Sequence, residues 1–134
     1  MPSFHDSADA EAPPEEVWKL LYDPARFPDW WAGIGTVETG TDGAYTMYPD
    51  GYPDFPMAQM LSTERDAQRV TVSCLVSDLR FDWRLEPLEG GARTRVTVEV
   101  EIPEAEAPRL EAQRDTIRAS LGNLAALAGA TETV

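Results

Sequence analysis

The sequence predicts an α+β fold in which one long helix covers the apolar face of a seven-stranded antiparallel sheet. Three observations predict it: residues 34–102 read as short strands separated by turn residues, a strand and two short helices precede them, and a long amphipathic helix follows them. No other segment is large enough to cover the apolar side of such a sheet, so the closing helix must do so.

The N-terminal part is predicted to form a strand and two short helices. Residues 3–11 alternate as a strand does, although their strand propensity is weak. The motif Pro13-Pro14-Glu15-Glu16 begins a helix, because proline and acidic residues suit a first helical turn. Asp23-Pro24 ends this helix, and the aspartate can cap a second short helix that runs to about Trp31.

Six further strands are predicted over residues 34–40, 44–48, 57–65, 68–77, 79–87 and 92–102. The last three alternate apolar and polar residues most clearly, which is typical of a sheet with one buried face and one solvated face. Arg80, Asp82 and Arg84 fall on the solvated face, where we expect a charge ladder that contributes little to stability.

Two short segments set the strand directions. Ser77-Asp78 is long enough only for a hairpin turn, and Glu89-Gly90-Gly91 forms a second one. The strands on either side of each turn are therefore antiparallel. Residues 48–56 contain three prolines, which a central strand does not tolerate, so this stretch is predicted as a long loop that carries aromatic side chains.

The chain closes with a helix predicted from about Glu104 to Leu127, and Gly129 is expected to end it. Its apolar side chains recur at helical spacing and form one stripe. They are Leu110, Ile117, Leu121, Leu124 and Ala128. This stripe is the surface that should pack against the sheet.

Charge and composition argue against several classes of function. The formal net charge of −13 over 134 residues opposes binding to nucleic acid or to an anionic membrane surface. One His and one Cys cannot build a Cys/His zinc site or an internal disulfide, and we expect no metal and no cofactor. No segment resembles a signal peptide or a membrane span, so a cytoplasmic protein is expected.

The segment from residue 12 to residue 31 resembles the opening of the START-like (SRPBCC) superfamily. Val17-Trp18 follows the proline-led helix start, and Asp23 to Trp30 matches the superfamily pattern D-P-x-x-x-P-x-W. The nearest branch is the polyketide cyclase/dehydrase and lipid-transport group. The resemblance implies the helix-grip fold over residues 1–134, with a curved seven-stranded sheet wrapped around the C-terminal helix. The matching residues are structural, so the resemblance carries over no catalytic residue.

A helix-grip fold encloses a cavity between the sheet and the last helix. We expect a mostly apolar and aromatic lining that suits a flat hydrophobic ligand, although the same side chains could simply fill the core. The candidate ligand-binding residues are Phe4, Met47, Met60, Cys74, Phe81, Trp83, Tyr52, Phe55 and Ile117. Tyr52 and Phe55 belong to the loop of residues 48–56, which either covers the cavity mouth or packs rigidly on the second helix.

Asp6 is the unusual charged residue, because alternation places it on the same face as Phe4. A buried carboxylate needs a partner, and Arg114 lies between Leu110 and Ile117 on the apolar stripe. Asp6 and Arg114 are therefore the candidate catalytic pair, able to orient a carbonyl or to transfer a proton. The alternative is that the first strand shifts by one residue, which leaves Asp6 in solvent.

The sequence is compatible with three functions. The first is a protein that binds a small apolar or aromatic ligand in the cavity and performs no chemistry. The second is a polyketide aromatase/cyclase or dehydratase that uses acid–base groups in that cavity. The third is an interaction module whose acidic surface docks a basic partner. A homodimer formed through the loop of residues 48–56 is compatible with all three.

Overall fold

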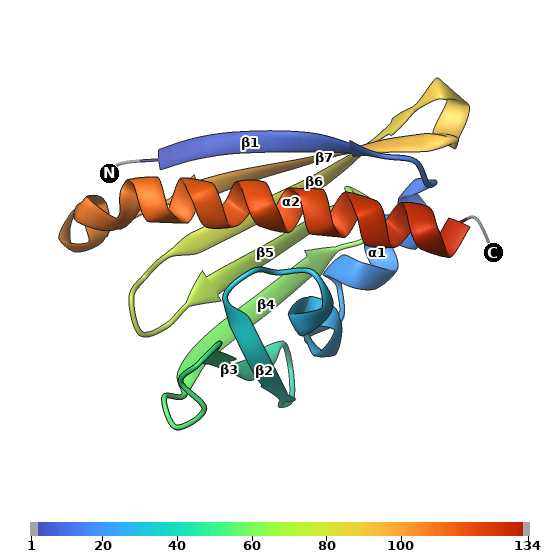
Figure 1. The fold of residues 1–134 in the computed structure, drawn as a ribbon. Helices are drawn as coiled ribbons and strands as arrows, with labels where there is room; N and C mark the ends of the chain where they lie inside the picture. Colours follow the sequence, from blue (N-terminus) through green and yellow to red (C-terminus); the bar gives the residue numbers. More distant parts are fainter. Residues whose placement is uncertain (1–2, 133–134) are drawn as a thin grey trace.

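The structure is a computed structural model that describes residues 3–132. Its elements are β1 (Ser3–Ala10), α1 (Pro14–Leu21), η1 (Pro24–Asp29), β2 (Ile34–Thr39), β3 (Ala44–Pro49), β4 (Met57–Glu64), β5 (Arg69–Cys74), β6 (Arg80–Leu88), η2 (Glu89–Gly91), β7 (Arg93–Glu101), η3 (Glu104–Arg109) and α2 (Leu110–Glu132). The elements labelled η are short 3₁₀ helices. The predicted order of a strand, two short helices, six strands and a long helix is confirmed (Figure 1).

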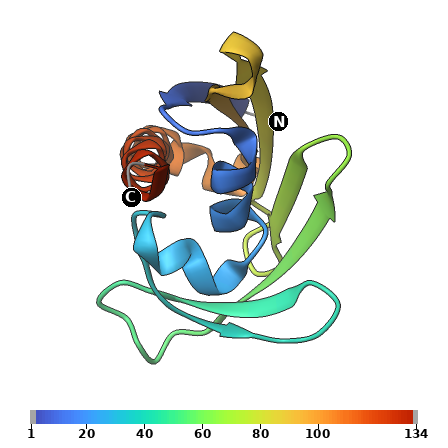
Figure 2. The same ribbon diagram turned by 90° about the vertical axis from the view of Figure 1, so that its right-hand side faces the viewer.

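Within the described residues, seven antiparallel strands form one sheet in the order β1-β7-β6-β5-β4-β3-β2. Consecutive strands pair from β2 to β7, whereas β1 lies at the far edge beside β7. Figure 2 shows the sheet curving from β1 and β7 down to β2 and β3, with α2 along its open side. The predicted helix-grip architecture is therefore confirmed.

The alternation of β6 and β7 places their apolar side chains under α2, as predicted. Val96, Val98 and Val100 of β7 are each at most 1% exposed, and Trp83 of β6 is 0% exposed. The residues between them, such as Glu99, face solvent. These two strands therefore supply the central floor of the core.

β5 is shorter than predicted. The strand expected over residues 68–77 ends at Cys74, and the next residues turn the chain into β6. The Asp78 N–H donates to Cys74 O at 2.9 Å, and Asp78 adopts a φ of 60°, so the two-residue turn predicted at Ser77-Asp78 is wrong. If the strand had continued to residue 77, alternation would have placed Val76 on the buried face. Because the strand ends earlier, the Val76 side chain is 59% exposed.

The long helix also differs from its predicted limits. Pro108 has no N–H, so the residues before Leu110 form the 3₁₀ turn η3 and regular α-helical hydrogen bonding begins after it. The helix continues past Gly129, because one glycine costs a helix only about 1 kcal/mol and Ala128 beside it is buried. Ile117, Leu121, Leu124 and Ala128 are buried as predicted.

α1 and η1 fill one end of the space between the sheet and α2 (Figure 2). Asp23 accepts a hydrogen bond from the Ala25 N–H at 3.1 Å, which confirms the predicted cap of η1. Trp30 Nε1 donates to Leu20 O at 3.0 Å, and Asn123 Nδ2 donates to Trp30 O at 3.2 Å. Hydrogen bonds thereby hold the Trp30 side chain to α1 and the Trp30 backbone carbonyl to α2.

Ser120 connects the next residues to α2. Its hydroxyl donates to Thr116 O at 2.7 Å and accepts the Ala32 N–H at 2.9 Å, and the Ser120 side chain is fully buried. The neighbouring Trp31 ring is held against Trp83 and Phe81, with centroid distances of 5.2 and 5.0 Å. The Ser120 hydroxyl therefore holds residues 31 and 32 against α2, so that the Trp31 ring packs in the core.

Asp82 corrects the charge ladder that was expected on the solvated face. It is only 7% exposed, and its main partner is Arg69 of β5 rather than Arg80. Arg69 donates two hydrogen bonds to it at 2.8 and 2.7 Å, and Arg84 donates one at 3.1 Å. Burial raises the pKa of the Asp82 carboxyl, but the hydrogen bonds from the two arginines outweigh burial and hold the pKa below its usual value.

Replacing Asp82 with Asn should lower the free energy of unfolding by about 1–3 kcal/mol at neutral pH, because two guanidinium groups lose a charged acceptor. Since the folded-state pKa is depressed, the contribution exists above the unfolded-state pKa of about 3.9 and disappears as the pH falls through the folded value. Urea unfolding should show the difference between the two proteins shrinking in acid. Asp54→Asn, at an exposed aspartate of the loop between β3 and β4, is the control and should change little; a pH-independent difference would contradict the assignment.

Replacing Ser120 with Ala should lower the free energy of unfolding by about 1–2 kcal/mol, because the Ala32 N–H loses its acceptor. Urea denaturation measures this effect. Ser62→Ala, at an exposed serine of β4, is the matched control and should have almost no effect. Equal stabilities of the two variants would show that the Ser120 bridge is not needed.

Candidate functional site

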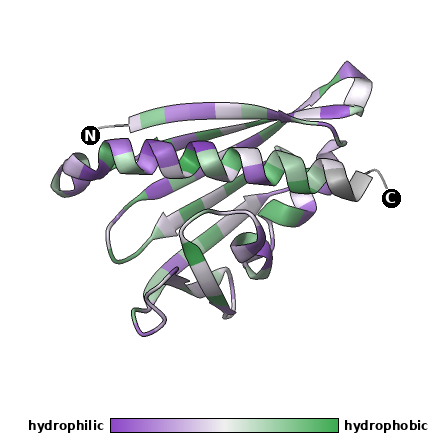
Figure 3. Ribbon diagram, viewed as in Figure 1, coloured by the Kyte–Doolittle hydropathy of each residue, from purple (hydrophilic) through white to green (hydrophobic). Residues whose placement is uncertain are grey.

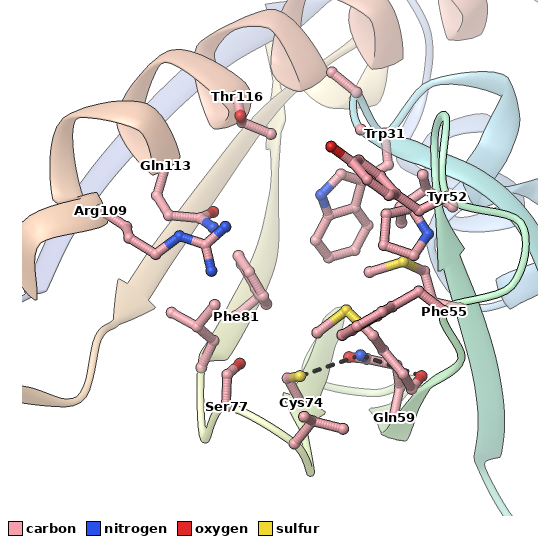
Figure 4. A pocket seen from close by; sticks show the side chains of 18 of the residues that line it. Trp31, Tyr52, Phe55, Gln59, Cys74, Ser77, Phe81, Arg109, Gln113 and Thr116 are labelled. Atoms are coloured by element: carbon pink, nitrogen blue, oxygen red, sulfur yellow. Dashed lines mark hydrogen bonds between the residues drawn. The ribbon is translucent and has the colours of Figure 1, made fainter. Parts of the chain in front are cut away.

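A cavity of about 660 Å³ lies between the sheet and the first half of α2. Strands β2 to β6 and the β5–β6 turn form one side of it, and η3 with α2 forms the other. Residues 31–34, which follow η1, complete its lining. The loop between β3 and β4 and the β5–β6 turn border its mouth (Figure 4).

The change in character along α2 explains why the cavity lies at one end of the helix. The second half carries the apolar stripe that packs into the core, whereas Gln113 and Thr116 of the first half, with Arg109 of the preceding η3, line the cavity. Figure 3 shows this change, with hydrophilic residues frequent near the start of α2 and hydrophobic ones along its second half. Polar side chains at these positions do not fill the space under the helix as leucines would.

One wall of the cavity is apolar and aromatic. Trp31 and Phe81 meet edge to face, with centroids 5.0 Å apart and an interplanar angle of 83°. Met47 and Met57 are paired across β3 and β4, and both line the cavity. Thioether and aromatic groups make favourable dispersion contacts with flat apolar molecules, and methionine adapts to their outline.

A row of three polar side chains crosses this wall. Tyr45 of β3 is opposite Gln59 of β4, and Gln59 is opposite Cys74 of β5, so all three point to the same face of the sheet. Each is 4% exposed, and each lines the cavity. We refer to Tyr45, Gln59 and Cys74 as the polar row.

The chemistry of the polar row is that of neutral hydrogen-bonding groups. Gln59 Nε2 donates to Cys74 Sγ at 3.3 Å and to Met57 O at 3.5 Å (Figure 4). Burial, and secondarily the nearby Cys74 thiol, raises the pKa of the Tyr45 phenol well above its ordinary value. Tyr45 therefore stays protonated and acts as a hydrogen-bond donor rather than as a base.

The mouth of the cavity carries further polar and aromatic groups. Ser77 Oγ in the β5–β6 turn is buried and has no hydrogen-bond partner among the described residues. Arg109 of η3 pairs with Glu106 at 3.6 Å and extends over the cavity (Figure 4). Tyr52 and Phe55 line the mouth and are 66% and 56% exposed; that this loop covers the mouth stays a prediction.

The nine predicted ligand-binding residues divide into two groups. Those that line the cavity are Met47, Tyr52, Phe55, Cys74 and Phe81. Those that lie outside its lining are Phe4, Met60, Trp83 and Ile117. Phe4, Trp83 and Ile117 are buried in the packed core instead.

Met60 shows that the predicted orientation of β4 is wrong. Its side chain is 39% exposed, whereas that of Gln59 is 4% exposed and faces the cavity. Met57 and Leu61 share the strand parity of Gln59 and are the more buried apolar residues of β4, so they carried the signal for the correct face. Trp31, Gln113 and Thr116 were also missed, although helical spacing places the latter two beside the stripe that contains Ile117.

Asp6 has a different partner from the predicted one. The strand does not shift, because Asp6 is opposite Val98 and on the same side as Phe4. Its carboxylate pairs with Arg118 at 3.3 Å, one helical turn beyond Arg114, whose guanidinium lies over the Phe4 ring at 5.6 Å. The Asp6–Arg114 pair is therefore wrong, and neither residue lines the cavity.

A metal centre and a membrane-spanning helix are two further features that can carry function. Among residues 3–132, no group of three His, Cys, Asp or Glu side chains lies close enough together to hold a metal ion. In that described part of the chain, no helix combines the length and the apolar character needed to cross a membrane.

Solved structures share this architecture at low sequence identity. The Zhui aromatase/cyclase from Streptomyces sp. R1128 has a TM-score of 0.77 and 16% identity, with 95% of this chain and 93% of that chain covered. The di-domain ARO/CYC BexL from the BE-7585A biosynthetic pathway has a TM-score of 0.76 and 18% identity, covering 93% of this chain and 45% of BexL. Protein CV1439 from Chromobacterium violaceum has a TM-score of 0.71 and 23% identity, with 96% and 99% covered. These likenesses show the fold.

The family is shown by the sequence itself. No curated protein sequence matches the chain. The family model described as polyketide cyclase / dehydrase and lipid transport, however, matches residues 1–129, which is nearly the whole chain. This match agrees with the START-like opening motif and with the helix-grip fold. The chain belongs to the polyketide cyclase/dehydrase and lipid-transport family.

Proposed function

We propose that this protein binds a small, flat apolar or aromatic molecule in the cavity between the sheet and α2. The observation that carries the proposal is the open cavity of about 660 Å³ with Trp31 and Phe81 in its wall. Pockets for small molecules typically measure about 300–1,000 Å³ and combine an apolar lining with a few polar groups. Membership of the family supports the same reading.

The lining favours an aromatic ligand over a flexible acyl chain. Trp31 and Phe81 are fixed by their mutual packing and by the Ser120 bridge to the Trp31 segment, so they present rigid ring surfaces. A flat ring system buries a large apolar area against such surfaces with little loss of side-chain entropy. Met47 and Met57 then adjust to the remaining outline of the ligand.

Replacing Thr116 with Phe should weaken binding of the uncharged fluorophore N-phenyl-1-naphthylamine by about tenfold or more, because the added ring occupies the cavity below α2. Fluorescence titration measures the binding, since this probe brightens when it leaves water. Ala119→Phe adds the same ring to an exposed position of the same helix and should bind the probe like the original protein. Equal affinity of all three proteins would place the ligand elsewhere, and absence of binding to the unaltered protein would reject the proposal.

Aromatase/cyclase or dehydratase activity is the second candidate function. The observation that favours it is the set of polar groups in the apolar cavity, because Tyr45, Gln59 and Ser77 could orient a poly-β-ketone chain. Such an enzyme would join a methyl carbon to a distant ketone carbon and release water. Asp6 and Arg114, the catalytic residues expected from the sequence, lie outside the cavity lining, so this candidate function does not depend on them.

The enzymatic candidate is tested with heptane-2,4,6-trione, whose intramolecular aldol closure and loss of one water give 5-methylresorcinol. If the protein is a cyclase, product should form faster than in buffer, as measured by chromatography. Because Asp6 pairs with Arg118 away from the cavity, Asp6→Asn should leave that rate unchanged. A rate equal to that in buffer counts against the enzyme, and loss of turnover in Asp6→Asn would restore Asp6 as a catalytic candidate. Docking of a basic partner and dimerisation stay predictions.

A further inference from the structure

We propose that the mouth of the cavity is a docking surface for a basic amphipathic segment of a partner protein. Six large apolar or aromatic side chains are exposed among residues 3–132; three of them line this mouth and a fourth adjoins it. We call these four the rim patch: Tyr52, Phe55, Leu75 and Val76, each more than half exposed. Apolar side chains that gather on a surface mark an interaction site, whereas scattered single ones do not.

Two loops bring the rim patch together. Tyr52 and Phe55 belong to the loop between β3 and β4, and Leu75 and Val76 begin the β5–β6 turn. The Leu75 N–H donates to Ala58 O at 2.9 Å, so the turn lies beside the first residues of β4, directly after the loop. Figure 1 shows both loops at the same end of the sheet, near the start of α2. The two loops therefore form one surface.

Acidic residues surround the rim patch. Asp50 and Asp54 lie in the β3–β4 loop and Asp78 lies in the β5–β6 turn, and all three are exposed. Neither residues 50–56 nor residues 75–79 include a basic side chain. Arg109 of η3 lines the mouth but is paired with Glu106 at 3.6 Å. A surface that complements the rim patch therefore has apolar side chains at its centre and basic ones around them.

Charge argues against two other occupants of this surface. A second copy of the chain would bring the same aspartates face to face across a twofold axis, where like charges repel. A membrane surface that contains anionic lipids would be repelled as well, and the formal net charge of −13 strengthens that repulsion. A basic amphipathic helix has the required pattern, because its apolar stripe is flanked by lysine or arginine side chains.

A rhodamine-labelled amphipathic helix of leucine and lysine tests the inference by fluorescence anisotropy. Its counterpart carries glutamate in place of every lysine, and the unaltered protein should bind only the lysine peptide. The double variant Leu75→Ser/Val76→Ser should bind it about tenfold or more weakly, because two apolar side chains are no longer removed from water. Met60→Ser is the matched control, since Met60 is also exposed but lies on the opposite face of the sheet from the cavity, and it should keep the affinity.

The contribution of charge is tested separately. The double variant Asp50→Asn/Asp78→Asn should bind the lysine peptide about 2- to 5-fold more weakly and with less sensitivity to salt, as loss of two exposed charge interactions predicts. Asp42→Asn/Asp66→Asn removes two exposed aspartates at the far ends of β3 and β4 and should bind like the unaltered protein.

The inference does not depend on what the cavity binds. Thr116→Phe, which fills the cavity behind the rim patch, should keep its affinity for the lysine peptide, so failure of ligand binding and failure of docking are distinguishable. Absence of peptide binding, equal binding of the two peptides, or unchanged affinity in Leu75→Ser/Val76→Ser would overturn the inference.

Sedimentation tests the two other occupants. A dimer of the unaltered protein that Leu75→Ser/Val76→Ser dissociates would show that a second copy covers the rim patch. Co-sedimentation with phosphatidylcholine vesicles that the same variant abolishes would show a lipid surface instead. Either result would overturn docking of a basic segment, for which we expect a protein that sediments as a monomer and leaves the vesicles unbound.

Discussion

The hydrogen bonds that tie Trp30 and Ala32 to the two helices are the constraint on which the rest of the structure depends. Trp30 bonds to α1 and accepts from α2, and the Ala32 N–H reaches Ser120, so the segment between η1 and β2 cannot move independently of either helix. It delivers Trp30 and Trp31 under α2, where they pack against Trp83. These rings fill one end of the space beneath the helix, and the cavity remains at the other end.

The two halves of α2 differ: the second half packs in the core, and the first half lines the cavity. Its second half is an ordinary amphipathic helix whose leucines and alanine close the core. In its first half, Gln113 and Thr116 take the positions that face the sheet, and Pro108 in η3 delays the start of the helix. The cavity therefore reflects the local sequence of the helix as much as the curvature of the sheet, since larger apolar residues here would fill the same space.

The sequence was sufficient to predict the fold because its strongest local signals agree with one another. The Asp23-Pro24 cap and the alternation in β6 and β7 appear where they were expected. The site was harder to predict, since the apolar residues of β4 fall on both faces: Met57 and Leu61 favour the face of Gln59, whereas Ala58 and Met60 favour the other. Pairing with β5, which places Gln59 opposite the buried Cys74, resolves this ambiguity. The partner of Asp6 was missed for a similar reason: the choice between Arg114 and Arg118 depends on the position of α2 over β1, which helical spacing does not determine.

The position of α1 and η1 has a kinetic consequence. Because they fill the space under the second half of α2, a ligand bound as proposed would exchange with solvent past the exposed side chains of Tyr52 and Phe55. Side chains of the wall would then determine how tightly the ligand is held at equilibrium, whereas those of the mouth would determine how fast it exchanges with solvent. A molecule longer than the cavity would extend past Tyr52 and Phe55 into solvent while its other end lay against the polar row.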